Sequence, residues 1–273
     1  MCILSNTIFK KLEKIEAMAW GDIYKAATPE IARKFGIDIF KIDSAVGGIA
    51  SAFDVLALNR VIGLGVDSDI TDDTIEDIIE KYKVINVPRF FIQLCTEIAG
   101  VELPSRLESH GFNHYNNWVK LYRDISPVTG IKSDLIAKEI GPEDAMKFGK
   151  IIVDSFGWPP EMTAWIACII GRPGWKFYMA YDNDTPVATA GMYVHDTTVW
   201  VDFAATLESH RGRGAQGLLL QRRIDDARDL GCDTVVVETA EETPEKPAPS
   251  YRNMIRHGFK LAYVRPNYIF INE

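Results

Sequence analysis

Three glycines and two arginines lie directly before a run of leucines, in the segment ESHRGRGAQGLLLQRRIDD (208–226). Glycine has no Cβ, so the backbone there can turn sharply and present its N–H groups to a ligand. The first N–H groups of a following helix have no partner inside that helix, and the helix dipole adds partial positive charge at the same end. Arg211 and Arg213 add full charges. The segment therefore predicts a binding site for a diphosphate.

The order of the glycines narrows the choice of diphosphate. A nucleoside-triphosphate loop has the pattern GxxxxGK[ST], and no Lys-Ser or Lys-Thr pair follows these glycines. The stretch GRGAQG (212–217) does satisfy the dinucleotide pattern GxGxxG. That pattern usually opens a parallel βαβ unit, whereas here it comes late in the chain, after three strands with hairpin spacing. A nucleotide-dependent oxidoreductase is thus an alternative, and it predicts affinity for NAD.

Hydrophobic periodicity places this loop between a strand and a long helix. The second half of the chain has the order β-α-α-β-β-β-α-β-α-β, which predicts an α/β protein with a mixed sheet and helices on its faces. We expect strands at 133–141, 175–181, 187–196, 197–207, 232–240 and 259–271, and helices at 142–157, 161–171, 215–231 and 251–258.

The first half contains a similar order of elements. His110-Gly111-Phe112 recurs as His257-Gly258-Phe259, 147 residues later. Gln93 likewise corresponds to Glu238, and Pro104-Ser105 to Pro249-Ser250, 145 residues later. This nearly constant shift predicts a duplicated domain. In the first copy we expect strands at 54–65, 89–97 and 112–124, and helices at 71–87 and 103–111.

The stretch 124–134, with Pro, Gly and Ser, is the expected linker between the copies. It gives a domain at 1–130 without the glycine-rich loop and a domain at 131–273 that carries the loop. A chain of 273 residues is long enough for two such domains.

Composition excludes several classes of protein. The net charge of −8 argues against a nucleic-acid partner, because that affinity depends on Lys and Arg neutralising phosphates. Cys2, Cys95, Cys168 and Cys232 are widely spaced, which fits neither a zinc site nor a disulfide framework and indicates a reducing cytoplasm. No apolar run approaches the ~18 residues that a membrane span needs. The first residues do not resemble a signal peptide.

The segment VDFAATLESHRGRGAQGLLL (201–220) resembles the acyl-CoA-binding motif of the GNAT superfamily of N-acyltransferases, [RQ]-x-x-G-x-[GA]. Arg211 and Gly214 fit this motif, whereas Gln216 stands where Gly or Ala is usual. NMIRHGF (253–259) is similar to the short helix of that family that ends in Gly-Phe. The resemblance covers about residues 133–271, and the first half is similar to the motif-less copy of tandem members. It implies two tandem GNAT-like domains, each with a mixed, mostly antiparallel sheet flanked by helices.

The resemblance implies acetyl-CoA as co-substrate, no metal, and direct transfer of the acetyl group to a primary amine. It also implies that backbone groups at the end of one strand hold the pantetheine arm and that loop amides hold the pyrophosphate. The residues expected to bind the coenzyme are Ala204, Ala205, Thr206, Arg211, Gly212, Arg213, Gly214, Ala215, Gln216, Gly217 and Asn253.

Direct transfer requires a base to deprotonate the ammonium and an acid to protonate the leaving thiolate. By the resemblance Glu238 is the candidate base, and its counterpart Gln93 in the first copy cannot take a proton. Asp202 is the rival base, since a carboxylate in a buried strand has a raised pKa. Met254 stands where the family usually has its acidic Tyr, so Tyr251, about one helical turn earlier, is the substitute candidate.

Two matters stay open on the sequence alone. A non-catalytic acyl-CoA-binding or regulatory module would keep the loop but lack a base and an acid. The acceptor, a small molecule or a peptide that presents an amine, and the oligomeric state leave no readable pattern. Trp158, Trp165 and Trp175 lie near the expected acceptor cleft, and either line it or pack in the core.

Overall fold

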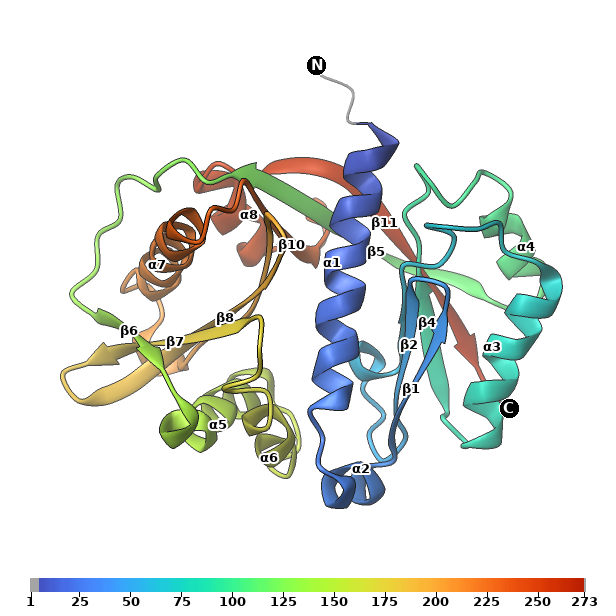
Figure 1. Cartoon of the computed structure of the whole chain (residues 1–273), viewed down its shortest axis with the longest axis horizontal. Helices are drawn as coiled ribbons and strands as arrows, with labels where there is room; N and C mark the ends of the chain where they lie inside the picture. The colour runs from blue at the N-terminus through green and yellow to red at the C-terminus, as the bar shows by residue number, and fades with distance from the viewer. Residues whose placement is uncertain (1–4, 273) are drawn as a thin grey trace. The chain divides into compact units, whose positions relative to one another are not determined.

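The computed structural model describes residues 5–272 (Figure 1). The chain forms two compact units, and neither is one continuous stretch of sequence. Unit 1 comprises Met1–Lys120, Thr239–Lys246 and Leu261–Glu273, and unit 2 comprises Leu121–Glu238 and Pro247–Lys260. Strand β5 (Asn113–Asp124) and strand β11 (Lys260–Ile271) therefore contribute residues to both units.

Unit 2 contains the strands and helices that the second half of the sequence predicts, except the strand at 259–271, with ends shifted by a few residues. The order of its strands is β5-β10-β9-β8-β7-β6. Its elements are β6 (Ile136–Ile140), η2 (Pro142–Asp144), α5 (Ala145–Phe156), α6 (Met162–Ala167), β7 (Trp175–Asp182), β8 (Thr185–His195), β9 (Thr198–Thr206), η3 (Glu208–His210), α7 (Ala215–Asp229), β10 (Thr234–Ala240) and α8 (Pro249–Arg256).

Strands β6 to β9 pair antiparallel with one another, and tight turns join β7 to β8 and β8 to β9. Asn183 and Asp196 adopt positive φ in these turns, a conformation that Asn and Asp tolerate better than most residues. Helix α7 then crosses over to β10, which pairs with β9 in parallel. The sheet is therefore mixed and mostly antiparallel, as predicted.

Helices cover both faces of this sheet (Figure 1). Side chains of successive strand residues point to opposite faces. Phe177 on β7 packs against Phe148 of α5, with ring centroids 5.1 Å apart. The next residue, Tyr178, donates a 2.7 Å hydrogen bond to Asp226 of α7. Helices α5 and α7 therefore lie on opposite faces of β7.

Unit 1 has the strand order β1-β2-β3-β4-β11-β5. Its core packs α3 and α4 against these strands through buried Ile, Leu and aromatic side chains. Besides β5 and β11, the elements of unit 1 are α1 (Asn6–Lys25), α2 (Pro29–Phe35), β1 (Ile37–Ile42), β2 (Ala45–Ala50), η1 (Leu56–Leu58), β3 (Arg60–Ile62), α3 (Asp72–Val84), β4 (Arg89–Gln93) and α4 (Leu103–Ser109).

Unit 1 repeats the order of elements in unit 2, with β3, α3, β4 and α4 in the places of β9, α7, β10 and α8. The expected strand at 54–65 is wrong in its extent, since only Arg60–Ile62 are extended. A short 3-10 turn precedes that strand, and Gly63 and Gly65 follow it with φ of 80° and 77°. These two glycines turn the chain away from the sheet.

The last strand of the chain completes the sheet of unit 1. Strand β11 pairs antiparallel with β4, from Asn267 opposite Gln93 to Ile271 opposite Arg89. Conversely, the last four residues of β5 belong to unit 2. The two copies thus exchange chain segments, and the functional division into residues 1–130 and 131–273 stays a prediction.

Candidate active site

Unit 2 contains a cavity of about 720 Å³. Its walls come from the end of α5, the end of β9, the glycine-rich loop and helix α8. All the residues expected to bind a coenzyme line it except Arg213. The full lining is Ser155, Phe156, Ala204, Ala205, Thr206, His210, Arg211, Gly212, Gly214, Ala215, Gln216, Gly217, Pro249, Ser250, Arg252, Asn253 and Arg256.

The backbone conformation of the glycine-rich loop favours glycine at two positions. Gly212 and Gly214 have φ of 81° and 77°, in the left-handed region that favours glycine. A Cβ on Gly214 would lie 2.2 Å from the carbonyl oxygen of Lys132, so only glycine fits there. The first helical hydrogen bond of α7 runs from Leu218 N–H to Gly214. The amides of residues 215–217 precede that bond and belong to residues that line the cavity, an arrangement that suits an anion.

The two arginines of the loop have different surroundings. Arg211 is exposed and lines the cavity. The guanidinium of Arg213 instead pairs with Asp134 and with Asp182, the latter at 2.6 Å, which raises the pKa of Arg213 and lowers the pKa of both carboxyls. His210 lies 3.3 Å from the same Asp182. The side chain of Arg213 thus anchors the loop, and only its backbone is left to contact a ligand.

Helix α8 adds two cations that the sequence analysis did not single out. Arg252 and Arg256 both line the cavity, together with Asn253. Their i, i+4 spacing in YRNMIR puts them on one face of the helix. This spacing is the feature of the sequence from which the pair could have been predicted. No Asp or Glu is among the residues that line the cavity in the described part of the chain. The cavity therefore has a positive wall suited to phosphates.

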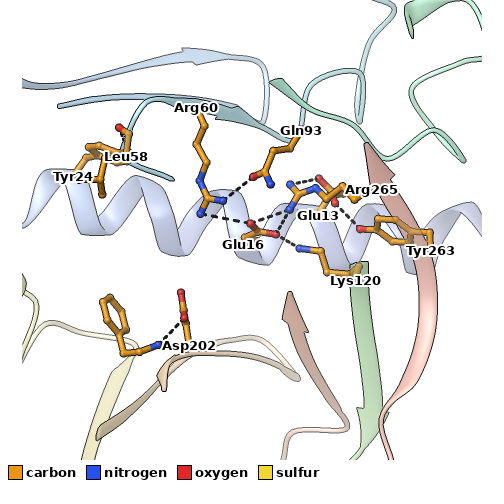
Figure 2. Close-up of polar contacts among 11 residues, drawn as sticks. Glu13, Glu16, Tyr24, Leu58, Arg60, Gln93, Lys120, Asp202, Tyr263 and Arg265 are labelled. Atoms are coloured by element: carbon orange, nitrogen blue, oxygen red, sulfur yellow. Dashed lines mark hydrogen bonds and ion pairs between the residues drawn. The ribbon is translucent and has the colours of Figure 1, made fainter. Parts of the chain in front are cut away.

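The end of β9 is bulged, and polar side chains hold the bulge. Phe203 has φ of 54°, and the pairing between β8 and β9 shifts register there. Asp202 Oδ1 accepts a 2.7 Å hydrogen bond from the Phe203 amide (Figure 2). Buried Arg223 donates to the carbonyls of Gly191 and Asp202, and burial lowers the pKa of Arg223 to about 10. Asp202 therefore has a local structural role.

Gln216 connects the start of α7 to the bulged strand. Its Nε2 donates hydrogen bonds to the Ala205 carbonyl at 2.8 Å and to Thr206 Oγ1 at 2.9 Å. The residue that departs from the family motif thus fills a specific place beside the cavity. Because the carbonyl of Ala205 already accepts this bond, the adjoining groups of Ala204 and Thr206 are better placed to contact a ligand.

Strands β9 and β10 separate next to the cavity. Their parallel pairing runs from Thr198 opposite Thr234 to Trp200 opposite Val236, and Glu238 follows two residues later. Glu238 is half-buried and is not among the residues that line the cavity. Tyr251 is also half-buried on α8 without lining the cavity, and Met254 is buried in the core. Position 254 therefore has no proton to give.

The corresponding strands of unit 1 stay paired further along. Strand β3 pairs with β4 through Ile62 opposite Gln93, the residue that corresponds to Glu238. The side chain of Gln93 accepts a 2.8 Å hydrogen bond from Arg60. The strands are thus closed in unit 1 at the point where they part in unit 2.

A buried polar cluster continues from this contact within unit 1 (Figure 2). Glu13 and Glu16 of α1 face Arg60, Lys120 and Arg265, and all five side chains are buried. Arg265 donates to Glu16 at 2.8 Å and to Glu13 at 3.0 Å, and Lys120 pairs with Glu16. The sheet face beside Gln93 is therefore filled by the chain's own side chains.

Comparison with known proteins agrees with this geometry. Residues 147–259 match the model of the acetyltransferase (GNAT) family. The matching residues make up most of unit 2, which contains the cavity, and this part of the chain is similar to the acetyltransferases of the GNAT family.

Solved structures share the fold across both units. A GCN5-related N-acetyltransferase from Kribbella flavida has a TM-score of 0.64 at 16% identity, with 96% of each chain covered. One from Sphaerobacter thermophilus has a TM-score of 0.60 at 16% identity, covering 96% of this chain and 91% of that chain. A tandem GNAT protein from the clavulanic acid biosynthesis pathway has a TM-score of 0.53 at 12% identity, covering 73% and 68%.

Four other expectations from the sequence can be compared with the structure. Between residues 5 and 272 no helix is long and apolar enough to cross a membrane, and no group of three or more His, Cys, Asp or Glu could hold a metal ion. Cys95, Cys168 and Cys232 form no disulfide, and Cys2 lies outside the described residues. Trp165 and Trp175 are buried in the core, whereas Trp158 is half-buried.

Proposed function

We propose that this chain transfers an acetyl group from acetyl-CoA directly to a primary amine, with the chemistry in unit 2. The observation that supports this most is the cavity itself. Loop amides and three arginines line it, beside strands that separate, and it contains no acidic lining residue among those described. Such a wall suits the phosphates of a coenzyme, and the separated strands leave room for a thioester.

The residues divide the work as follows. The amides of Gly212 through Gly217 and the charge of Arg211 hold the pyrophosphate. Ala204, Ala205 and Thr206 lie along the pantetheine arm, and Asn253 contacts the coenzyme from α8. A backbone amide at the end of β9 polarises the acyl carbonyl as negative charge develops on its oxygen.

Glu238 is the proposed base that takes the proton from the attacking ammonium. It lies on β10 two residues beyond Val236, the last residue of β10 that pairs with β9. Asp202 is the weaker candidate, because its carboxylate accepts a hydrogen bond from the Phe203 amide in the bulge. Tyr251 is the proposed acid for the leaving thiolate, since Met254 cannot serve.

In this proposal unit 1 is a structural copy that binds no acetyl-CoA. Pairing of β3 with β4 through Gln93 and the buried cluster beside it support this division. A cytoplasmic location fits cysteines that form no disulfide, and it belongs to the same proposal.

Titration calorimetry with acetyl-CoA tests the coenzyme site. Gly214 is a poor choice for the variant, because any side chain there would contact Lys132. Arg211→Glu instead reverses a charge on the cavity wall, and Arg33→Glu makes the same change on an exposed residue of unit 1. We expect the native chain and Arg33→Glu to bind acetyl-CoA, and Arg211→Glu to bind at least tenfold more weakly. Equal binding by Arg211→Glu, or affinity for NAD in place of acetyl-CoA, would contradict the proposal.

Glu238→Gln separates an enzyme from a non-catalytic binding module. The substitution keeps the shape of the side chain and removes the base. We expect at least a hundredfold loss of kcat, the usual contribution of a positioned base, with an unchanged Kd for acetyl-CoA. Asp202→Asn serves as the comparison, and a larger loss in that variant would reassign the base. Buried Met254 at the usual Tyr position is the observation that favours the binding module.

A further inference from the structure

The cavity of unit 2 has two chemically different sides. The side formed by the loop and α8 carries Arg211, Arg252 and Arg256. The side formed by the end of α5 consists of Ser155 and Phe156 and carries no charge. A phosphate-bearing ligand would use the first side, which leaves the second for the other substrate.

These two sides belong to opposite faces of the sheet. Helix α7, which starts at the loop, packs on one face, and α5 packs on the other. The cavity reaches both because β9 and β10 are no longer paired beyond Trp200 and Val236. The acetyl donor and the acceptor can therefore approach the same opening from opposite faces, and direct transfer requires that both be bound there at once.

The end of α5 presents an aromatic pair at this opening. The ring of Phe156 stacks on the ring of Trp158, with centroids 5.2 Å apart and planes inclined by 27°. Phe156 is 52% exposed although it is large and apolar. The buried stripe of α5 consists of other residues, among them Phe148 and Ile152. The core therefore does not account for the position of the Phe156 ring.

The turn at the end of α5 fixes the relative position of Phe156 and Trp158. Gly157 adopts φ of 65° and its N–H bonds to the Val153 carbonyl, which ends α5. The Trp158 amide also donates to the Val153 carbonyl, at 3.1 Å. This left-handed turn is a standard helix C-terminus, and it fixes the chain between the two rings. Phe156, the member of this pair that lines the cavity, is thus a preformed aromatic surface there.

The charges of the cavity restrict the acceptor further. Its described lining contains three arginines and one histidine but no carboxylate. In the proposed function the arginines face the coenzyme phosphates, and the uncharged side that is left for the acceptor has no carboxylate to pair with the several positive charges of a polyamine or a lysine-rich peptide. A compound with a single amine on a flat apolar body fits both the charge and the rings, because aromatic rings gain from stacking beyond the burial of their area.

We infer that the acceptor is an arylalkylamine, a single primary amine carried on an aromatic ring that stacks on Phe156. This inference rests on the proposed acetyl transfer and names the substrate class of the same site. The amine attacks the thioester carbonyl, the C–S bond breaks, and the products are the acetamide and the free thiol of CoA. The proton lost by the amine is the one assigned to the base above.

Acetylation kinetics on the full chain test the inference. The substrates are phenethylamine, hexylamine as an aliphatic amine of equal charge, and spermidine as a polyamine. We expect kcat/KM for phenethylamine to exceed both others by about tenfold or more. In Phe156→Ala we expect KM for phenethylamine to rise about tenfold and KM for hexylamine to change much less. Phe156→Leu should behave like Phe156→Ala if the ring matters rather than the apolar volume.

Met146→Ala is the matched control, because Met146 is an exposed apolar residue of the same helix that does not line the cavity. It should leave every KM unchanged, and all three variants should keep the Kd for acetyl-CoA within about twofold. A preference for hexylamine or spermidine, or an unchanged KM in Phe156→Ala, would overturn the inference while acetyl-CoA binding still supported the proposed function. Absence of acetyl-CoA binding in the native chain would instead overturn both.

Discussion

Arg60 donates a 2.8 Å hydrogen bond to Gln93, across two paired strands of unit 1. The repeat places Gln93 where unit 2 has Glu238, the proposed base. One copy thus uses this position inside a buried polar network, and the other leaves a carboxylate at the point where its strands separate. The two copies share a fold, but the side chain at this position has a structural role in unit 1 and a proposed catalytic role in unit 2.

The buried network of unit 1 makes Glu16 a critical residue for stability. Glu16 accepts hydrogen bonds from Arg265, pairs with Lys120 and lies 4.0 Å from Arg60. Glu16→Gln removes one of the two buried carboxylates that face three buried cations, and removal of one partner of a buried ion pair typically costs about 3–5 kcal/mol. Urea unfolding should show this loss, whereas Glu76→Gln, at an exposed position of α3, should change stability by less than about 0.5 kcal/mol. A loss as small as that of the control would show that the network is not stabilising.

The two glycines of the loop should differ in their tolerance of alanine. Both have positive φ, so either substitution costs roughly 1–2 kcal/mol in backbone strain. At Gly212 a Cβ would meet nothing within 4 Å, whereas at Gly214 it would lie 2.2 Å from the Lys132 carbonyl. Gly214→Ala should therefore lower the melting temperature clearly more than Gly212→Ala. Equal shifts in a thermal scan would contradict the packing of the loop against residue 132.

The sequence was sufficient to predict the loop and the order of most elements. Its glycines, arginines and following helix form one local pattern, and such a pattern can be recognised without knowledge of the tertiary structure. Residues 6–50 gave no prediction, although they supply α1, with Glu13 and Glu16, and the hairpin of β1 and β2. Charged residues on a helix normally indicate an exposed face, so their burial against Arg265 could not be read locally. The exchange of strand β11 is likewise a long-range pairing that no short segment encodes.

Arg213 illustrates the limit within the site itself. Its position in the loop suggested a phosphate ligand, yet Asp134 and Asp182 hold its side chain. These partners lie 79 and 31 residues away in the sequence. Conversely, Arg252 and Arg256 of α8 line the cavity, although the sequence analysis did not single them out. It interpreted that helix mainly through the Gly-Phe that follows it.

Arg252 and Arg256 should contribute to coenzyme affinity through charge. Arg252→Gln combined with Arg256→Gln removes two positive charges from the cavity wall. We expect acetyl-CoA to bind about tenfold more weakly at low ionic strength, with a smaller difference at 1 M salt because screening weakens the interaction. Calorimetry at two salt concentrations checks this, with Arg33→Gln as control. A loss that does not depend on salt would point to altered packing of α8 rather than to charge.

His257 should give unit 2 a pH-dependent stability just below neutrality. Burial, together with the charges of Arg256 and Arg123, lowers the pKa of His257 below its usual value of 6.5. The folded state therefore binds this proton less readily than the unfolded state. Stability should be fully present above pH 6.5 and fall as the pH drops through 6.5 toward the lowered pKa of the folded state. The His257→Gln variant should lack the loss of stability that comes from protonation of His257. The His195→Gln variant, changed at an exposed histidine, should retain that loss. Unfolding measured at intervals between pH 7.5 and 5 checks the difference, and parallel curves for His257→Gln and the native chain would contradict the assignment.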